Sequence, residues 1–323
     1  MSANSECRIC YNQVNNRSFF IREMHIGTRE EFEYFECSNC GCLQIKLYPQ
    51  DLGKYYPDEY GAYKVSNSER SGKFIGYLRE RKLKYVLNEK KNLIGFLLNI
   101  VIKPGFEQKM LPAGVKSDSS ILDIGSGVGS LILNLRNKGF RNITGTDIFI
   151  KNDLIYDDCL RIYKKELNEI EGQFDFIMMN HSFEHMPEPD EVFKHLHRLI
   201  KPQRMVMIRI PVKTDYIWNR YGINWGSIDA PRHFYLHTLK SMDIIAARNK
   251  FKIEKVIFDS GIFQFYSSEQ YIKDIPLRSE NSYYLKSKKS IFSRSDIKGF
   301  QEKANELNRI HQGDGACFYL RPL

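Results

Sequence analysis

The feature that constrains this chain most is a glycine-rich loop between a predicted strand and a predicted helix. The segment 121–129 reads ILDIGSGVG and leads directly into a helical pattern over 130–138. Glycines without a side chain allow the backbone to approach a ligand closely. The spacing is G-x-G-x-G, whereas the dinucleotide fingerprint G-x-G-x-x-G would need glycine where this chain has Ser130. The loop therefore predicts a nucleotide-type ligand and argues against NAD and FAD.

Two acidic residues flank this loop at positions suited to such a ligand. Asp123 precedes the first glycine by two residues, and Asp147 closes the next predicted strand. A carboxylate at Asp123 can hold an amino-acid ammonium group, directly or through water. A carboxylate at Asp147 can accept hydrogen bonds from both hydroxyls of a ribose. Together with the loop, the two residues predict a site for an adenosyl amino acid.

Predicted strands and helices alternate from Ser119 onward. Apolar strands are expected over 121–124, 142–146, 174–179, 205–210 and 252–258. Helices are expected over 130–138, 190–200 and 239–249. Continuous apolar strands between amphipathic helices indicate a mostly parallel sheet that is covered on both faces. The fold class is therefore α/β and Rossmann-like. A weakly marked further strand is expected near 161–164.

The chain is long enough for two or three structural units. Of its 323 residues, we assign 1–50 to a small cysteine-rich module, 51–115 to a helical linker or cap, and 116–323 to the α/β domain. Two stretches, 211–237 and 260–315, interrupt the alternation. In α/β folds such insertions commonly form the substrate side of a site. We therefore expect both insertions, the second of them helical, to contribute to acceptor binding.

The N-terminal block contains two matched cysteine pairs, Cys7-x-x-Cys10 and Cys37-x-x-Cys40. Four thiolates from two such turns form the closed tetrahedral shell that suits structural zinc. We predict a zinc-ribbon-like module that holds Zn²⁺ through these four residues. Free thiols and a redox pair are the alternatives. The polar N-terminus lacks an apolar signal region, so the cysteines are expected to be reduced and the protein cytoplasmic.

Residues 119–258 resemble the class I S-adenosylmethionine-dependent methyltransferases. The resemblance rests on ILDIGSGVG, on the acid in GTDIF, on the strand FDFIMMN and on HSFEHMPEP before a helix that ends in LIKP. It implies a mostly parallel seven-stranded sheet. With the cysteine block, YYPDEYGAY and NWGSIDAPRHFYLHT, the whole chain resembles bacterial methyltransferases that accompany surface-polysaccharide and modified-sugar genes. This resemblance implies O-methylation of a sugar that is nucleotide-linked or part of a polysaccharide.

The cofactor contacts implied by the resemblance follow the loop and the ends of the strands. Contacts to the adenine are placed near Asp158 and Cys159, and Tyr56 and Tyr60 are expected to close over the cofactor or to pack. The residues assigned to the S-adenosylmethionine site are Tyr56, Tyr60, Asp123, Gly125, Ser126, Gly127, Gly129, Asp147, Ile148, Asp158, Cys159, Asn180 and His181.

Candidate catalytic residues lie in two places. His181 follows Asn180 at the carboxyl end of the central strand, where open α/β sheets bind their ligands. Asp229, Arg232 and His233 are grouped in the first insertion; His233 is a candidate general base, and Arg232 could bind a phosphate or carboxylate with two hydrogen bonds. The alternatives are a polar cap for His181 and a loop-anchoring role for His233.

The formal net charge of +9 permits other partners. An RNA methyltransferase that reads nucleic acid through the zinc module is the alternative function, although the cysteine block lacks a dense basic cluster interleaved with aromatic residues. A non-enzymatic binding module is the third hypothesis, and the complete loop argues against it. The segment 79–102 joins cations to an apolar run; a helix docked on the core is the favoured interpretation, and peripheral membrane contact is the other. As the acceptor of the methyl group, we expect a small molecule.

Overall fold

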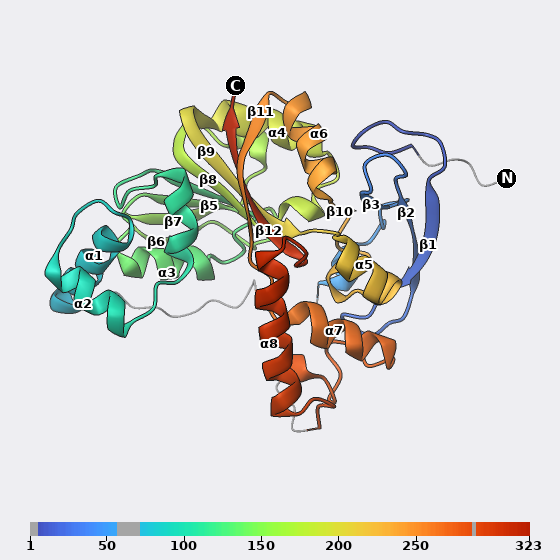
Figure 1. The fold of residues 1–323 in the computed structure, drawn as a ribbon. Helices are drawn as coiled ribbons and strands as arrows, with labels where there is room; N and C mark the ends of the chain where they lie inside the picture. Colours follow the sequence, from blue (N-terminus) through green and yellow to red (C-terminus); the bar gives the residue numbers. More distant parts are fainter. Residues whose placement is uncertain (1–5, 57–71, 286–288) are drawn as a thin grey trace.

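The computed structural model describes residues 6–56, 72–285 and 289–323. A twisted central sheet lies in the middle, with the N-terminal strands on one side, the helices α1 and α2 on the opposite side, and the helices α7 and α8 below (Figure 1). This arrangement confirms the predicted α/β fold with additional elements around a single sheet.

The bounds of the elements agree closely with the sequence pattern. The first strands are β1 Arg17–Arg22, β2 Glu31–Glu36 and β3 Leu43–Ile45, and the remaining ones are β4 Ile121–Ile124, β5 Ile143–Thr146, β6 Leu154–Asp157, β7 Leu160–Tyr163, β8 Phe174–Asn180, β9 Ile200–Pro211, β10 Tyr235–Leu236, β11 Phe251–Phe258 and β12 Gly315–Pro322. The helices are α1 Lys73–Val86, α2 Leu93–Val101, α3 Ser130–Lys138, α4 Pro189–Leu199, α5 Asp215–Tyr221, α6 Leu239–Arg248, α7 Phe263–Ile272 and α8 Arg294–Arg309.

The central sheet has the strand order β11-β12-β9-β8-β4-β5-β7-β6. The pairs β4–β5, β5–β7, β4–β8 and β8–β9 are parallel, while β12 runs antiparallel to both of its neighbours. Seven of these strands form the predicted sheet, but the sheet has eight. The extra strand, β6, is only four residues long and forms an antiparallel hairpin with β7.

Side chains of the central strands alternate between two cores, one on each face of the sheet. On β8, Phe176 and Met178 pack with α1 and α3, while Ile177 and Met179 pack with α4, α6 and the N-terminal strands. Each of these four residues is fully buried. This explains why the strands read as continuous apolar runs rather than as alternating ones.

The N-terminal strands form a second, four-stranded sheet with the order β1-β2-β3-β10. Its last strand, β10, comes from the insertion over 211–237 and pairs with β3. The hydroxyl of Tyr34 on β2 also donates a hydrogen bond to the carbonyl of His233 over 2.8 Å. The cysteine-rich block and the first insertion are therefore joined by main-chain pairing.

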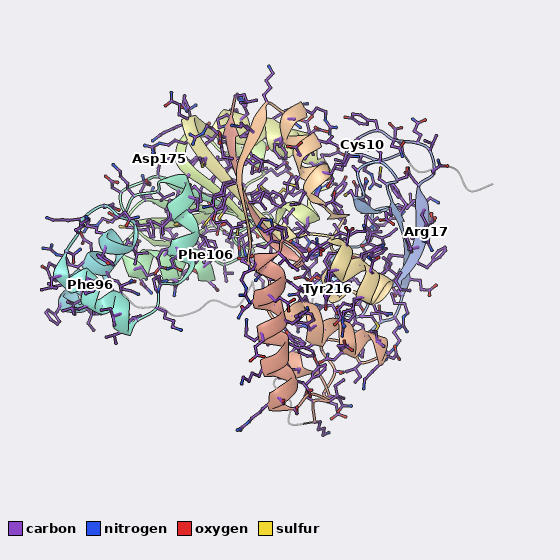
Figure 2. All side chains as sticks on the ribbon, viewed as in Figure 1. Cys10, Arg17, Phe96, Phe106, Asp175 and Tyr216 are labelled. Atoms are coloured by element: carbon purple, nitrogen blue, oxygen red, sulfur yellow. The ribbon has the colours of Figure 1, made fainter. Side chains whose placement is uncertain are left out.

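The second insertion lies between β11 and β12 and contains α7 and α8. Trp225, in the first insertion, is buried, and its indole nitrogen donates to Asp314 Oδ2 over 2.9 Å, so this residue packs in the interior. Figure 2 shows Cys10 and Arg17 on the N-terminal side of the molecule and Phe96, on α2, at the opposite extremity.

Candidate active site

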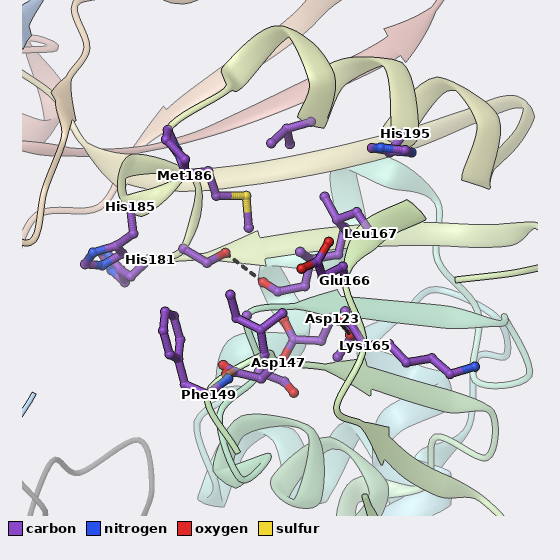
Figure 3. A pocket seen from close by; sticks show the side chains of 18 of the residues that line it. Asp123, Asp147, Phe149, Lys165, Glu166, Leu167, His181, His185, Met186 and His195 are labelled. Carbon is purple, nitrogen blue, oxygen red and sulfur yellow. Dashed lines mark hydrogen bonds between the residues drawn. The ribbon is translucent and has the colours of Figure 1, made fainter. Parts of the chain in front are cut away.

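A cavity of about 810 Å³ opens at the carboxyl ends of β4, β5, β7 and β8. This is where open α/β sheets bind ligands, and the volume lies within the usual range for a small-molecule site. Figure 3 shows Asp123 and Asp147 at its floor, His181 and His185 on one side, and Lys165, Glu166 and Leu167 on the other. The predicted residues Tyr56, Asp123, Gly125, Ser126, Asp147, Ile148, Asn180 and His181 all line it.

The glycine loop forms the floor of the cavity. Gly125, Gly127 and Gly129 have φ angles of 76°, 55° and 82°, in the left-handed region that L side chains seldom adopt. A Cβ atom at Gly125 would also lie 2.4 Å from Cβ of Ser182. Gly127 and Gly129 do not line the cavity but shape the loop: the amide of Gly127 donates to Asp147 Oδ2 over 2.9 Å, and Gly129 precedes α3.

The two acidic residues face the cavity without a cationic partner among the described residues. Burial and, to a lesser extent, the nearby Asp147 together raise the pKa of Asp123 to about 8. Burial also raises the pKa of Asp147, against the lowering effect of the amides of Phe149 and Gly127. Two buried carboxyls close together are costly unless a cationic or hydrogen-bond-donating ligand compensates them. The pair therefore fits a ligand with an ammonium group and ribose hydroxyls.

The adenine side of the cavity differs from the sequence-based assignment. Asp158 and Cys159 lie in the turn between β6 and β7, at the amino end of β7, and they do not line the cavity. The segment after the carboxyl end of β7 lines it instead, through Lys165, Glu166, Leu167 and Asn168. The rule that ligands bind at carboxyl ends, applied to the weak strand near 161–164, could have found this segment.

A buried carboxylate surrounded by histidines lies behind the opposite end of the cavity. Glu184 is fully buried, and Nδ1 of His181 lies 3.4 Å from its Oε1. Nε2 of His233 lies 3.9 Å from the same oxygen, and a nitrogen of His185 is also within 4.8 Å of the group. Burial would raise the pKa of Glu184, but the contact with His181 and the charge that His185 and His233 can carry lower it to about 2. Glu184 is therefore ionised at neutral pH.

His181 and His185 bring imidazole nitrogens from this group into the cavity. His181 is 44% exposed and has a φ of 56°, and its Nε2 contacts the guanidinium of Arg209. Nδ1 of His185 lies 2.8 Å from the carbonyl oxygen of Arg232, and burial lowers the pKa of His185 to about 4. His185 also lines the cavity.

Tyr56 and Asn180 complete this end. The hydroxyl of Tyr56 lies 3.2 Å from Nδ1 of His185, and its ring stacks on Phe149 with centroids 5.7 Å apart. Oδ1 of Asn180 accepts from Arg209 over 3.2 Å, and Arg209 is anchored by Asp259 at 2.7 Å. Tyr60 lies outside the described residues. Tyr56 is thus placed over the cavity beside the histidines.

Asp229, Arg232 and His233 do not line the cavity but form a layer behind it. Arg232 is only 2% exposed, and its guanidinium pairs with Asp229 and contacts Nδ1 of His25 over 2.9 Å. Separating such a buried pair costs several kcal/mol, so Arg232 is not available to bind an acceptor phosphate. His233 directs Nδ1 to the carbonyl of Ser227 at 2.8 Å and Nε2 toward Glu184 and Asp229. These three residues support the cavity wall.

The four paired cysteines converge on one point of the N-terminal module. Cys7 and Cys40 have their sulfurs 3.6 Å apart, and Cys10 and Cys37 have theirs 3.4 Å apart. All four sulfurs lie within 4.8 Å of one another. Tetrahedral Zn–S bonds of about 2.3 Å require sulfurs roughly 3.8 Å apart, which this group matches closely. The donor set and spacing therefore fit zinc.

Comparison with known proteins agrees with this site. Residues 104–256 match the family model of a methyltransferase domain. The ubiquinone biosynthesis O-methyltransferase of Saccharomyces cerevisiae mitochondria is 26% identical over 113 residues, which is 32% of this chain and 36% of that protein. The ubiquinone biosynthesis O-methyltransferase of Pseudomonas aeruginosa is 29% identical over 99 residues, 27% of this chain and 42% of that protein. The chain thus spans only about two fifths of these relatives.

A solved S-adenosylmethionine-dependent methyltransferase from Archaeoglobus fulgidus superposes with a TM-score of 0.41 at 20% identity and covers 71% of this chain and 99% of that one. The fold assignment rests on the strand order rather than on this likeness. The segment that matches the family model contains the glycine loop, Asp123, Asp147 and Glu184. The segment that matches the methyltransferase-domain model therefore provides most of the residues that line the cavity.

Proposed function

We propose that this chain transfers a methyl group from S-adenosylmethionine to a hydroxyl group of a sugar, either nucleotide-linked or part of a surface polysaccharide. One observation carries methyl transfer. The same cavity has the carboxyl groups of Asp123 and Asp147, which lack a cationic partner among the described residues, and the imidazole of His181, which contacts the buried Glu184. The family-model match and the two curated O-methyltransferases support the reaction class. The sequence resemblance to sugar methyltransferases supports the acceptor class.

At the floor of the cavity, Asp123 would hold the ammonium group of the cofactor and Asp147 its ribose hydroxyls. Leu167 and Ile148 would contact the adenine, since both line the side beyond β5 and β7. When bound, S-adenosylmethionine supplies an electrophilic methyl group on a sulfonium. The remaining space lies toward Tyr56, Phe149 and His181, and aromatic faces beside polar groups suit a sugar ring.

The proton of the acceptor hydroxyl would pass to Nε2 of His181 once the guanidinium of Arg209 has left that nitrogen. His181 is more exposed than His185, and Glu184 lies behind its Nδ1 at 3.4 Å. A buried carboxylate in this position holds the imidazole ring and stabilises the imidazolium ion that proton transfer creates. His185 and His233 face the same carboxylate and help to spread that charge.

The test uses purified full-length chain with methyl-labelled S-adenosylmethionine and a panel of nucleotide-sugars, polysaccharides and RNA. We expect label on a sugar hydroxyl, and Glu184→Gln should lower kcat by about 10²-fold while the Kd for S-adenosylhomocysteine stays within about threefold. The variant His197→Gln, on the exposed side of α4, is the control and should retain full activity.

Each other result has a definite meaning. Transfer to RNA alone would refute the sugar acceptor and support the nucleic-acid alternative. Absence of calorimetric binding of S-adenosylhomocysteine would refute methyl transfer altogether. A kcat that depends on added Mg²⁺ or Mn²⁺ would refute the proton-accepting role of the histidine group, because Glu184, His185 and His233 would then act as metal ligands.

We further propose that Cys7, Cys10, Cys37 and Cys40 hold one structural Zn²⁺. The fit of the four sulfurs to a tetrahedral ion supports this. The closed shell leaves no position for substrate, so the ion would stabilise the module rather than act in catalysis. Elemental analysis of the purified chain tests the proposal; less than one zinc per two chains after metal-replete purification would refute it.

A further inference from the structure

The helix α2 presents an unusually apolar face to solvent. Val101 is 81% exposed and Leu93 72% exposed. Further large apolar residues on this helix and directly after it are also exposed: Ile94, Phe96, Leu97, Ile100 and Ile102. Soluble monomers seldom expose so many large apolar side chains side by side. We refer to Leu93, Phe96, Leu97, Ile100 and Val101 as the apolar face of α2.

This face is open because α2 touches the rest of the chain along one narrow line. Gly95 is the buried contact: a Cβ atom there would lie 2.5 Å from Cβ of Tyr85 and 2.6 Å from the carbonyl of Arg81 on α1. The sequence had favoured a helix docked on the core. That expectation holds for α1, whose Leu83 is buried against α3 and the sheet, but is wrong for α2.

Cations surround the apolar face, and α2 carries no acidic residue. Lys90 and Lys91 precede the helix and Lys103 follows it, and none of these three exposed side chains forms an ion pair with any described residue. The nearest acidic groups are already engaged: Glu80 pairs with Lys84 and Arg141. Glu89 accepts from the hydroxyl of Ser117. The surface therefore combines apolar side chains with uncompensated positive charge.

We propose that the apolar face of α2 and its flanking lysines dock this protein on an anionic lipid bilayer. A helix of nine residues is about 13 Å long, far less than the roughly 30 Å of a hydrocarbon core. Within the described residues, no helix has the length and apolarity to span a bilayer. A short helix with apolar residues beside lysines instead lies in the interfacial plane, where anionic headgroups attract the cations.

The charge distribution favours a lipid surface over a second copy of the chain. Two copies packed through their α2 faces would bring Lys90, Lys91 and Lys103 of each close to those of the other, with no acidic residue on the helix to compensate. Anionic headgroups, in contrast, compensate every lysine at once. The location of α1 and α2 at one extremity of the molecule also leaves the face free to meet a flat surface (Figure 1).

Sedimentation with sucrose-loaded vesicles tests this inference on the full-length chain. We compare phosphatidylcholine vesicles with vesicles containing about 30% phosphatidylglycerol at 0.1 M salt and expect at least tenfold stronger partitioning to the anionic ones. Leu97→Glu combined with Ile100→Glu should reduce that partitioning at least tenfold. Lys90→Gln combined with Lys91→Gln should reduce it about tenfold and weaken its salt dependence.

The control is Leu47→Glu, an equally exposed leucine in the N-terminal module, which should bind vesicles like the parent chain. Unchanged affinity for S-adenosylhomocysteine shows that each variant is folded, since α2 lies outside the cavity. Equal binding to both vesicle types, or absence of binding, overturns the proposal. So does a concentration-dependent dimer in sedimentation that Leu97→Glu and Ile100→Glu abolish without any effect on vesicles.

Discussion

The two ends of the cavity are built in different ways. The cofactor end comes from one continuous stretch, in which β4, the glycine loop, α3 and β5 place Asp123 and Asp147 within a single βαβ unit. The histidine end is assembled from distant segments: the end of β8, the first insertion and the tyrosine before α1. The first end thus depends on local geometry, whereas the second depends on tertiary packing against the N-terminal sheet.

This contrast predicts that substitutions in the glycine loop abolish cofactor binding even when the histidine end of the cavity is unchanged. Gly125→Ala should weaken binding of S-adenosylhomocysteine at least about 100-fold, because the added Cβ meets Ser182 at 2.4 Å and φ is positive. Gly172→Ala is the matched control, since it has a φ of 85° but nothing within 4 Å of its Cβ.

Gly172→Ala should lower the free energy of unfolding by about 1–2 kcal/mol and leave cofactor affinity unchanged. Calorimetric titration of both variants separates backbone strain from steric clash. If Gly125→Ala bound S-adenosylhomocysteine as tightly as the parent chain, the loop would not form the floor of the cofactor site.

The histidine end of the cavity should depend on the cysteine-rich module. Tyr34 donates to the carbonyl of His233, and Thr238 donates to the carbonyl of Cys40, so the module supports the segment that carries His233. Cys10→Ser should remove the proposed Zn²⁺, lower Tm and reduce kcat by roughly thirtyfold, because small displacements of the proposed catalytic groups are costly. The Kd for S-adenosylhomocysteine should change by less than about threefold.

Cys159→Ser provides the comparison, because this cysteine lies in the turn between β6 and β7, remote from the four-cysteine group. It should retain zinc, Tm and kcat. Steady-state kinetics gives kcat for Cys10→Ser and Cys159→Ser, and elemental analysis gives the zinc content of each variant. Loss of cofactor affinity in parallel with kcat would show that the two ends of the cavity are not independent.

The same contrast explains what the sequence could predict. The loop, its two acids and the strands around them are encoded by local patterns, and the structure places them as expected. The histidine group depends on contacts between segments up to about 200 residues apart, such as Tyr34 with His233. Local spacing suggested that Asp229, Arg232 and His233 face the acceptor, but burial directs Arg232 to Asp229 instead.

The strand β7 and the helix α2 show two other limits of local patterns. Four residues with alternating exposure give little signal for a strand, and Asp158, near which the sequence-based adenine contacts are expected, lies at its amino end and does not line the cavity. For α2, an apolar run reads as a core helix in the sequence, because composition does not reveal whether a neighbour covers it. Only the packing through Gly95 shows that most of the helix is open.

The smallest expected effect concerns pH, and it tests the charge balance of the cofactor end. With its pKa raised to about 8, Asp123 is protonated in the free chain at neutral pH. A ligand that carries an ammonium group binds the ionised form, so a proton competes with it below pH 8. The Kd for S-adenosylhomocysteine should therefore rise about tenfold between pH 9 and pH 7.

Asp123→Asn sharpens this comparison, because it separates binding from stability. Between about pH 4 and pH 8 the folded chain holds a proton on Asp123 that the unfolded chain releases, so this carboxyl lowers stability progressively as pH rises through that window. The amide should raise Tm at pH 8, weaken ligand binding and remove the pH dependence of Kd. Asp175→Asn, which loses a carboxylate paired with Lys201 at 3.1 Å outside the cavity, should leave the pH dependence intact. A Kd that is flat with pH in the parent chain would mean that Asp123 is already ionised, and that its burial is compensated before any ligand arrives.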